Sequence, residues 1–128
     1  MRFLLDTHVF LWWNEDNPRL SKKAKRIMAD PRNTLVLSVA SAWEIAIKVQ
    51  LGKLRLPEDA ASYVPARAAR DSIEILPILL PHALALESLP MHHRDPFDRI
   101  LVVQSQLEKL PILTADPAIT AYPVSVIW

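Results

Sequence analysis

The amino-acid sequence predicts an α/β fold in which helices cover both faces of a parallel sheet. Short, continuously hydrophobic segments alternate along the chain with segments of helical periodicity, and unbroken hydrophobic strands are typical of a parallel sheet buried on both faces. The chain has 128 residues, of which 51% are hydrophobic and 23% charged, as expected for a globular protein with one sizeable core. No linker or repeat divides it, so we expect residues 1–128 to form a single domain.

The first half of the chain contains two expected strands, each followed by helical segments. The helix that begins at Ser21 has an apolar stripe from Leu20 to Met28 and a basic opposite face, which is typical of a helix packed on a core. Gly52 is the only glycine and is suited to end a helix, because glycine readily adopts the left-handed conformation found there. The expected elements are a strand at residues 3–5, a helix at 9–13, the helix from 21, a strand at 34–39 and a helix at 41–51.

The second half of the chain continues this alternation and adds three strands. Two of its helices are expected to begin with proline, at Pro57 and Pro96, where a missing backbone N–H is tolerated. Pro65 is expected to disturb the first of these helices. The expected elements are a helix from 57 to 68, a strand at 73–78, a short helix at 82–89, a long buried helix from 96, and strands at 112–114 and 124–128.

Composition excludes several classes of protein and of active site. No apolar run approaches the roughly eighteen residues that a membrane-spanning helix requires, and the N-terminus lacks the pattern of a secretory signal. The absence of cysteine excludes disulfides and thiolate metal ligands, and it is compatible with the reducing cytoplasm in which we expect the protein. The single glycine excludes glycine-rich phosphate loops, and no Gly-x-Ser-x-Gly nucleophile motif is present.

Four acidic residues occur where an expected strand ends or a helix begins: Asp6, Glu44, Asp98 and Asp116. The carboxyl ends of parallel strands meet in one crevice, so these side chains are expected to gather there. Two carboxylates about 5 Å apart repel by roughly 3 kcal/mol at an effective dielectric constant of about 20, so the cluster needs protons or a cation. Carboxylate oxygens favour Mg²⁺ or Mn²⁺. The pattern predicts a metal site suited to hydrolysis of a phosphodiester.

Each of these acids also has a purely structural explanation. Asp6 and Asp116 each precede a helix, where aspartate is a good N-cap. Glu44 fits a capping box that begins at Ser41, and it could pair with Lys48 one helical turn later. Against this, apolar neighbours surround Glu44 in the sequence, and a buried carboxylate needs a partner.

The third acid lies in a dense polar cluster before the long helix. Asp95 has the position of an N-cap and Asp98 lies in the first turn, where acids are stabilised by the helix dipole. Two acids within four positions exceed what capping requires. His92 and His93 raise the alternative of zinc, but adjacent histidines seldom face the same way in a strand, and no third nitrogen ligand has a suitable spacing.

Basic and hydroxyl side chains near these acids are the expected supporting groups. When four carboxylates are set aside in one site, ten acidic residues remain against 15 basic ones, and a net positive surface suits a polyanion. Arg94 and Arg99 adjoin the acidic cluster and are the expected phosphate contacts. Thr7 and Thr114 are expected to donate hydrogen bonds around the carboxylates.

Two other groups of residues leave alternatives open. Trp12 and Trp13 are adjacent, and paired tryptophans more often belong to a core or an interface than to a platform for RNA bases. A lysine-rich helix face is usually only solvated, but contact with RNA is the alternative for four basic residues: Lys22, Lys23, Lys25 and Arg26.

Four blocks of sequence, taken together, resemble the PIN-domain family, and within it the VapC-type toxins of toxin–antitoxin pairs. The resemblance extends from end to end of the chain and is specific because the blocks occur in the family's order and spacing. The blocks are Leu4–His8 (LLDTH), Ser38–Ile45 (SVASAWEI), Arg94–Leu101 (RDPFDRIL) and Leu113–Asp116 (LTAD).

The resemblance implies a three-layer α/β/α sandwich with a central five-stranded parallel sheet and Mg²⁺- or Mn²⁺-dependent endoribonuclease activity. It also implies a homodimer that is inhibited by a VapB-like antitoxin. Carried over by motif, Asp6 is similar to the family's first metal ligand, Glu44 to the second acid and Asp116 to the fourth. Asp98 is favoured as the third acid because the family's acid typically precedes the apolar run of the helix, with Asp95 in support.

The antitoxin in such pairs inserts apolar side chains into a groove of the toxin. Trp12, Trp13 and the apolar side of the Leu20–Met28 helix are the expected groove residues. A non-catalytic PIN-like module that binds RNA or protein is the alternative function. A metal-dependent phosphatase is disfavoured, because such enzymes have a second aspartate two residues after the first and His8 occupies that position here.

Overall fold

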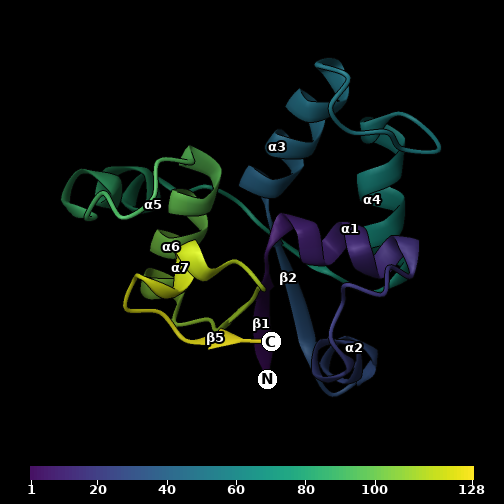
Figure 1. Ribbon diagram of the computed structural model, residues 1–128, viewed down its shortest axis with the longest axis horizontal. Helices are drawn as coiled ribbons and strands as arrows, with labels where there is room; N and C mark the ends of the chain where they lie inside the picture. Colours follow the sequence, from purple (N-terminus) through teal and green to yellow (C-terminus); the bar gives the residue numbers. More distant parts are fainter.

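A five-stranded sheet with the strand order β3-β2-β1-β4-β5 forms the centre of the molecule, and every neighbouring pair of strands is parallel. The computed structural model describes residues 1–128 (Figure 1). The strands are β1 (Arg2–Leu5), β2 (Thr34–Ser38), β3 (Glu74–Leu76), β4 (Ile112–Leu113) and β5 (Val126–Ile127). The helices are α1 (Thr7–Glu15), α2 (Lys22–Ala29), α3 (Val39–Gln50), α4 (Ala60–Arg70), α5 (Leu80–Ala85), α6 (Pro96–Glu108) and α7 (Pro117–Thr120), with a 3₁₀ turn η1 (Leu86–Ser88) after α5.

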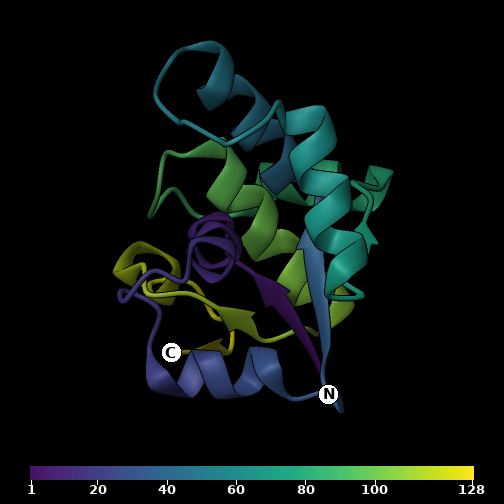
Figure 2. The same cartoon turned by 90° about the vertical axis from the view of Figure 1, so that its right-hand side faces the viewer.

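Helices lie on both sides of this sheet. α5, α6 and α7 lie on one side, and α1, α2 and α4 lie on the other (Figure 1). In the view of Figure 2, α2 lies along the bottom of the molecule, between the positions of the two termini. None of the helices has the length and apolarity that crossing a membrane would require.

Alternating side chains of the strands fill two separate cores. In β1, Phe3 and Leu5 belong to a core shared with α1, α2 and α4, whereas Leu4 belongs to a core shared with α6 and α7. Strand residues alternate between faces because successive side chains point to opposite sides of a sheet. The expected three-layer α/β/α sandwich with a five-stranded parallel sheet is therefore confirmed.

The boundaries of two helices show where local sequence signals hold and where they fail. Ser21 caps α2 as expected. α4 begins later than expected, because the side chain of Asp59 accepts a hydrogen bond from the backbone N–H of Ser62 at 2.8 Å. Pro57 therefore precedes the helix, and the expectation that it opens α4 is wrong. Pro65 lies inside α4, which continues past it.

The junction between β2 and α3 corrects a second expectation. The side chain of Ser38 accepts a hydrogen bond from the N–H of Ala40 at 3.0 Å, so the strand ends at Ser38 and the helix begins at Val39. The expected capping box at Ser41 is wrong, because Ser41 lies buried inside α3. At the other end of α3, Gly52 has a φ of 72°, which confirms its expected role in ending the helix.

The strand order brings the ends of β1 and β4 together at the centre of the sheet. Connections from β1 lead through β2 to β3 on one side, whereas β4 and β5 lie on the other side. In such doubly wound sheets the crevice at the carboxyl ends of the strands, where the order reverses, is the usual ligand site. Asp6 follows β1 and Asp116 follows β4, so two of the four expected acids lie at this reversal.

Candidate active site

Asp6 and Thr114 connect the ends of the two central strands. Asp6 is buried, with 4% of its surface exposed, and its Oδ2 accepts a hydrogen bond from the Thr114 hydroxyl at 2.6 Å. Burial raises the pKa of Asp6 above its ordinary value, and the charges of Glu44 and Asp116 add to this rise, against the hydrogen bond from Thr114 and the charge of His8. Asp6 therefore has a hydroxyl donor but too little compensating positive charge.

The two carboxylate oxygens of Asp116 make different contacts. Its Oδ1 accepts a hydrogen bond from the N–H of Ala118 at 2.9 Å, so the residue caps α7. Its Oδ2 lies 3.9 Å from Nε2 of His93. The two readings of Asp116 in the sequence, as a helix cap and as a site acid, are thus geometrically compatible.

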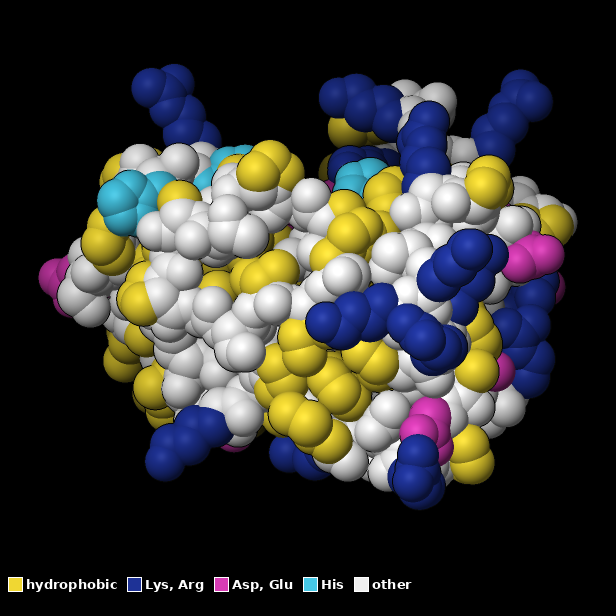
Figure 3. All heavy atoms as spheres, turned by 60° about the horizontal axis from the view of Figure 1, so that its bottom comes forward, with side chains coloured by type: hydrophobic (Ala, Val, Ile, Leu, Met, Phe, Trp, Pro, Cys, Tyr) yellow, Lys and Arg dark blue, Asp and Glu magenta, His cyan; other side chains and the backbone are white.

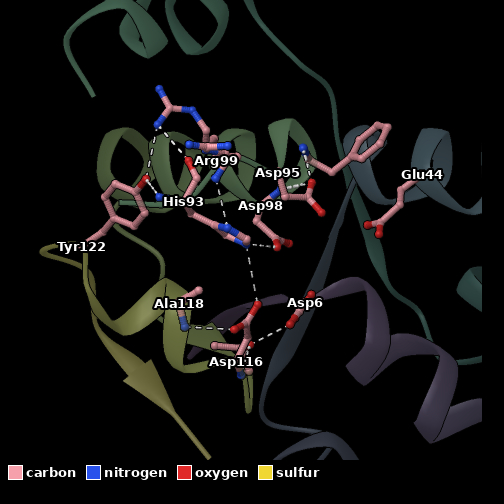
Figure 4. Close-up of polar contacts among 12 residues, drawn as sticks. Asp6, Glu44, His93, Asp95, Asp98, Arg99, Asp116, Ala118 and Tyr122 are labelled. Carbon is pink, nitrogen blue, oxygen red and sulfur yellow. Dashed lines mark hydrogen bonds and ion pairs between the residues drawn. The ribbon is translucent and has the colours of Figure 1, made fainter. Parts of the chain in front are cut away.

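Asp95 and Asp98 have different surroundings although they lie three residues apart. Oδ1 of Asp95 accepts hydrogen bonds from the N–H groups of Phe97 and Asp98 at 2.8 and 3.3 Å, so Asp95 caps α6. The carboxylate of Asp98 faces the interior of the crevice, where its Oδ2 lies 2.7 Å from Nε2 of His93 (Figure 4). Asp98, and not Asp95, is the acid of α6 that joins the cluster.

The pKa of Asp98 is also raised above its ordinary value. Burial is the largest cause, and the negative charges of Asp6 and Asp95 add to it, so that the pKa of Asp98 rises to about 7. The hydrogen bond from His93 lowers the pKa but does not offset these effects. Burial and the neighbouring carboxylates together therefore disfavour the charged form of Asp98.

His93 is the site residue that sequence reasoning did not select. Ligand atoms of His93, Asp98 and Asp116 all lie within 4.8 Å of one another, and the imidazole lies between the two carboxylates (Figure 4). Adjacent histidines were set aside because they diverge in a strand, but here they lie in the loop before α6. They do diverge, since the ring of His92 packs on Tyr122 with the centroids 5.1 Å apart. Only His93 is directed toward the acids, and this single ring lies close to both Asp98 and Asp116.

Glu44 approaches the cluster from α3 and has one oxygen without a partner. The residue is 3% exposed, and its Oε2 accepts a hydrogen bond from Lys48 at 2.6 Å. Its Oε1 is buried and has no hydrogen-bond partner, which is costly for an ionised group. The carboxylate points toward the space that the other acids face (Figure 4). A buried acceptor without a donor fits a cation, and the arrangement of four carboxylates is suited to hold one.

The model of the PIN domain matches residues 3–124 of the chain. The chain belongs to the PIN-domain family.

A curated relative and several solved structures are similar to this PIN domain. Ribonuclease VapC16 of Mycobacterium tuberculosis is 53% identical over 58 residues, which span 42% of this chain and 41% of that protein. The match therefore spans about two fifths of the relative's length.

Several solved structures match nearly the whole chain. VapBC2 from Rickettsia felis, bound to a DNA fragment from its promoter, has a TM-score of 0.73 at 15% identity, with 99% of this chain and 98% of that chain covered. A toxin–antitoxin complex from Klebsiella pneumoniae has a TM-score of 0.63 at 18% identity, with 98% and 96% covered. At these identities the likeness shows the PIN fold alone.

Arg94 and Arg99 occupy opposite environments in this PIN domain. Arg99 is 9% exposed, and its guanidinium donates hydrogen bonds to the carbonyl oxygens of Pro90 and Leu89 and to the hydroxyl of Tyr122. The expectation that Arg99 contacts phosphate is wrong, because its donors are used to hold the loop before α6. Arg94 is exposed and its side chain makes no ion pair, so its donors are free.

Thr7 and Thr114 also differ in what they support. Thr114 bonds directly to Asp6, as described above. The hydroxyl of Thr7 instead donates to Oγ of Ser41 at 2.8 Å. This buried bond joins α1 to α3, so Thr7 fixes the helix that carries Glu44 and does not contact a carboxylate itself.

The two adjacent tryptophans of the PIN domain do not form one groove. Trp12 lines a pocket with Asp6 and Asp116. Trp13 lines a different pocket, together with Asp71. Its indole N–H donates to Oδ2 of Asp71 at 3.0 Å. The apolar side of the Leu20–Met28 segment packs against the core, and Met28 also lines a pocket beside Trp13.

Proposed function

We propose that this PIN domain is a Mg²⁺- or Mn²⁺-dependent endoribonuclease that acts as the toxin of a toxin–antitoxin pair. The observation that supports it best is the convergence of four carboxylates from four elements, one of them with a buried, unpaired oxygen. Membership of the PIN family and the similarity to Ribonuclease VapC16 support RNA as the substrate.

The metal would be held by the acids of the crevice. Asp6, Asp98 and Asp116 are the proposed ligands, and carboxylate oxygens are the donors that Mg²⁺ and Mn²⁺ prefer. When bound, the ion supplies activation of a water nucleophile and stabilisation of the charge on the leaving oxygen of the phosphodiester.

The remaining residues position these groups. Oε1 of Glu44 is the free acceptor that would orient the attacking water and take its proton, while Lys48 holds Oε2 and fixes the carboxylate. Thr114 fixes the rotamer of Asp6, and His93 fixes that of Asp98. Orientation of this kind contributes to catalysis, because a general base must lie within hydrogen-bond reach of the proton that it removes.

A positively charged surface supports a polyanionic substrate. Lysine and arginine side chains gather on the α2 side of the face in Figure 3, with few acidic side chains among them. α2 contributes four basic residues, of which Lys22, Lys23 and Arg26 are exposed, and contact between the four and RNA is part of the proposal. Arg94, whose donors are free, is the arginine that we retain as a phosphate contact.

The proposed partners are a VapB-like antitoxin and a second copy of the chain. The toxin–antitoxin complexes among the similar structures support an antitoxin. Trp13 is the groove candidate that we retain, because it lines a pocket of about 570 Å³ together with Met28, Arg70 and Asp71. We further propose that residues 1–128 act as one domain in the cytoplasm.

Cleavage of RNA by the purified chain tests the enzymatic part of this proposal. Total bacterial RNA is incubated with the protein in Mn²⁺, in EDTA, and with the double variant Asp6→Asn, Asp98→Asn. Discrete fragments that disappear in both controls are expected. Absence of cleavage by folded protein that is free of antitoxin would favour the alternative, a PIN module that binds RNA or protein without cutting it.

A further inference from the structure

Trp12 lies between the acidic crevice and a second, basic pocket. The first pocket, of about 260 Å³, is lined by Asp6, Asp116, His8 and Trp12 among others. The second, of about 350 Å³, is also lined by His8 and Trp12, together with Lys48 and Lys53. His8 and Trp12 are the residues that the two linings share. A ligand that extends from the acids into the second pocket therefore passes the indole of Trp12.

We propose that Trp12 is a stacking platform for one base of single-stranded RNA, and that the lysines of the second pocket hold the adjoining backbone. This inference rests on the proposed function, since it takes RNA as the substrate of the acidic crevice. It assigns a substrate subsite to residues that have no part in holding the metal.

The indole of Trp12 is held in place and remains accessible. It is partly exposed, its ring centroid lies 6.0 Å from that of Trp128 and 5.7 Å from that of His8, and the guanidinium carbon of Arg19 lies 6.0 Å from the ring centroid. A ring supported in this way loses little freedom when a base stacks on it. Stacking on an aromatic side chain contributes about 1–3 kcal/mol per base and accepts any base, because every base has a π-face.

The charges around Trp12 favour a nucleic acid over an apolar peptide. Lys53 is exposed and makes no ion pair, and Lys48 is held at the edge of the pocket by Glu44. Arg19 adds a third cation beside the indole, and Glu15 is the one acid in the lining of the second pocket. Cations that follow the backbone beside an aromatic ring are the usual composition of a single-strand binding site.

A binding experiment with and without bases tests this proposal. The Asp98→Asn variant, which is expected not to cleave, is titrated with labelled decauridylate and with a ten-unit abasic ribose-phosphate chain, and fluorescence anisotropy gives the affinities. Decauridylate is expected to bind more tightly. Adding Trp12→Leu is expected to weaken decauridylate binding by about tenfold to hundredfold and to leave the abasic chain unaffected, whereas Trp12→Phe is expected to retain most of the affinity.

Trp13→Leu in the same background is the matched control. It removes the neighbouring indole from a pocket that shares no lining residue with either pocket of Trp12, so it is expected to lower the melting temperature without changing the preference for bases. Equal affinity of the unsubstituted background for the two oligomers would overturn the proposal whether or not the variants fold. The proposal would also be overturned if Trp12→Leu weakened the binding of an antitoxin peptide and left the binding of decauridylate unchanged.

The two proposals fail in different ways. Cleavage of RNA combined with no effect of Trp12→Leu on base-dependent binding would remove the stacking site and keep the nuclease. Base-dependent binding through Trp12, combined with no cleavage under any condition, would keep the stacking site and remove the nuclease.

Discussion

Two histidine–carboxylate pairs lie at opposite ends of α6, and they have different consequences. His93 pairs with Asp98 near the start of the helix, and His82 pairs with Glu108 at its end, with 3.2 Å between Nε2 and Oε1. The ring of His82 is buried, and its Nδ1 accepts a hydrogen bond from the N–H of Leu79 at 3.0 Å. Both nitrogens of His82 are therefore satisfied by protein groups.

The surroundings of the two pairs, and not the pairs themselves, make the difference. Glu108 is the one carboxylate that contacts His82. Around His93, Asp98 and Asp116 are joined by the buried acids Asp6 and Glu44. A single histidine–carboxylate pair links α5 to α6, whereas a surplus of carboxylates around a pair of the same kind needs protons or a cation. The surplus of negative charge therefore distinguishes the candidate active site from a structural contact.

Replacing each histidine by glutamine gives the largest expected contrast. His93→Gln is expected to lower the rate of RNA cleavage by about 10- to 100-fold, as is usual for a residue that orients a metal ligand, with little change in melting temperature. His82→Gln is expected to lower the free energy of unfolding by about 1–3 kcal/mol through its lost buried hydrogen bonds, with an unchanged rate for the folded fraction. Cleavage rates and thermal melts of both variants would measure this; an equal loss of rate in both would contradict the assignment.

The effect of Mn²⁺ on thermal stability should differ between variants at the two ends of α6. Mn²⁺ at about 100 times its dissociation constant is expected to stabilise the parent protein by roughly 2.7 kcal/mol, because it binds the folded state alone. Asp98→Asn should lose most of this response, whereas Glu108→Gln should keep it. Melting temperatures with and without Mn²⁺ would provide the measurement. A full metal response in Asp98→Asn would show that the ion is held elsewhere.

The pH dependence of stability without metal gives a further contrast. The pKa of Asp98 is raised to about 7 in the folded protein, whereas an unfolded aspartate titrates near 3.8. A raised carboxyl pKa stabilises the fold below the unfolded value, and this contribution is lost as the pH rises through the folded value. In EDTA the melting temperature is therefore expected to fall between about pH 4 and pH 7. Asp98→Asn should reduce the fall and Glu108→Gln should preserve it; identical profiles for the two variants would contradict the charge argument.

The smallest effect is expected at the Glu108 end of α6. Glu108→Gln keeps a side-chain oxygen for His82 and removes only the charge of a residue whose side chain is 34% exposed. Partly exposed ion pairs contribute about 0–1 kcal/mol, so the free energy of unfolding should change by no more than that. Urea denaturation would measure it. A loss of several kcal/mol would show that His82 and Glu108 form a strongly coupled buried pair.

The sequence predicted the order of the elements better than their ends. The five strands and the caps at Ser21, Asp95 and Asp116 follow from local patterns, because hydrophobic runs and cap side chains act within a few residues. The start of α3 was displaced, since both Ser38 and Ser41 could cap it and only Ser38 lies where β2 ends. Competing local signals of this kind are decided by the length of the strand that pairs in the sheet.

The sequence indicated which acids gather in the candidate site better than it indicated how the side chains around them are directed. Asp6, Glu44, Asp98 and Asp116 do converge, because elements that end at one edge of a parallel sheet share a crevice. Arg99 turned inward to the loop carbonyls, His93 turned toward the acids, and the indoles of Trp12 and Trp13 diverged. No local pattern distinguishes these directions.

By itself, the sequence determined the α/β architecture and the positions of four acids along it. These depend on hydrophobic periodicity and on residue type at the ends of elements, both of which are local. Only the tertiary structure decided that Asp95 caps α6 while Asp98 faces the crevice, and that Oε1 of Glu44 is left without a donor. Those outcomes depend on which side of each helix meets the sheet and on which distant groups come within hydrogen-bond reach, and such contacts are made only when the whole chain has packed.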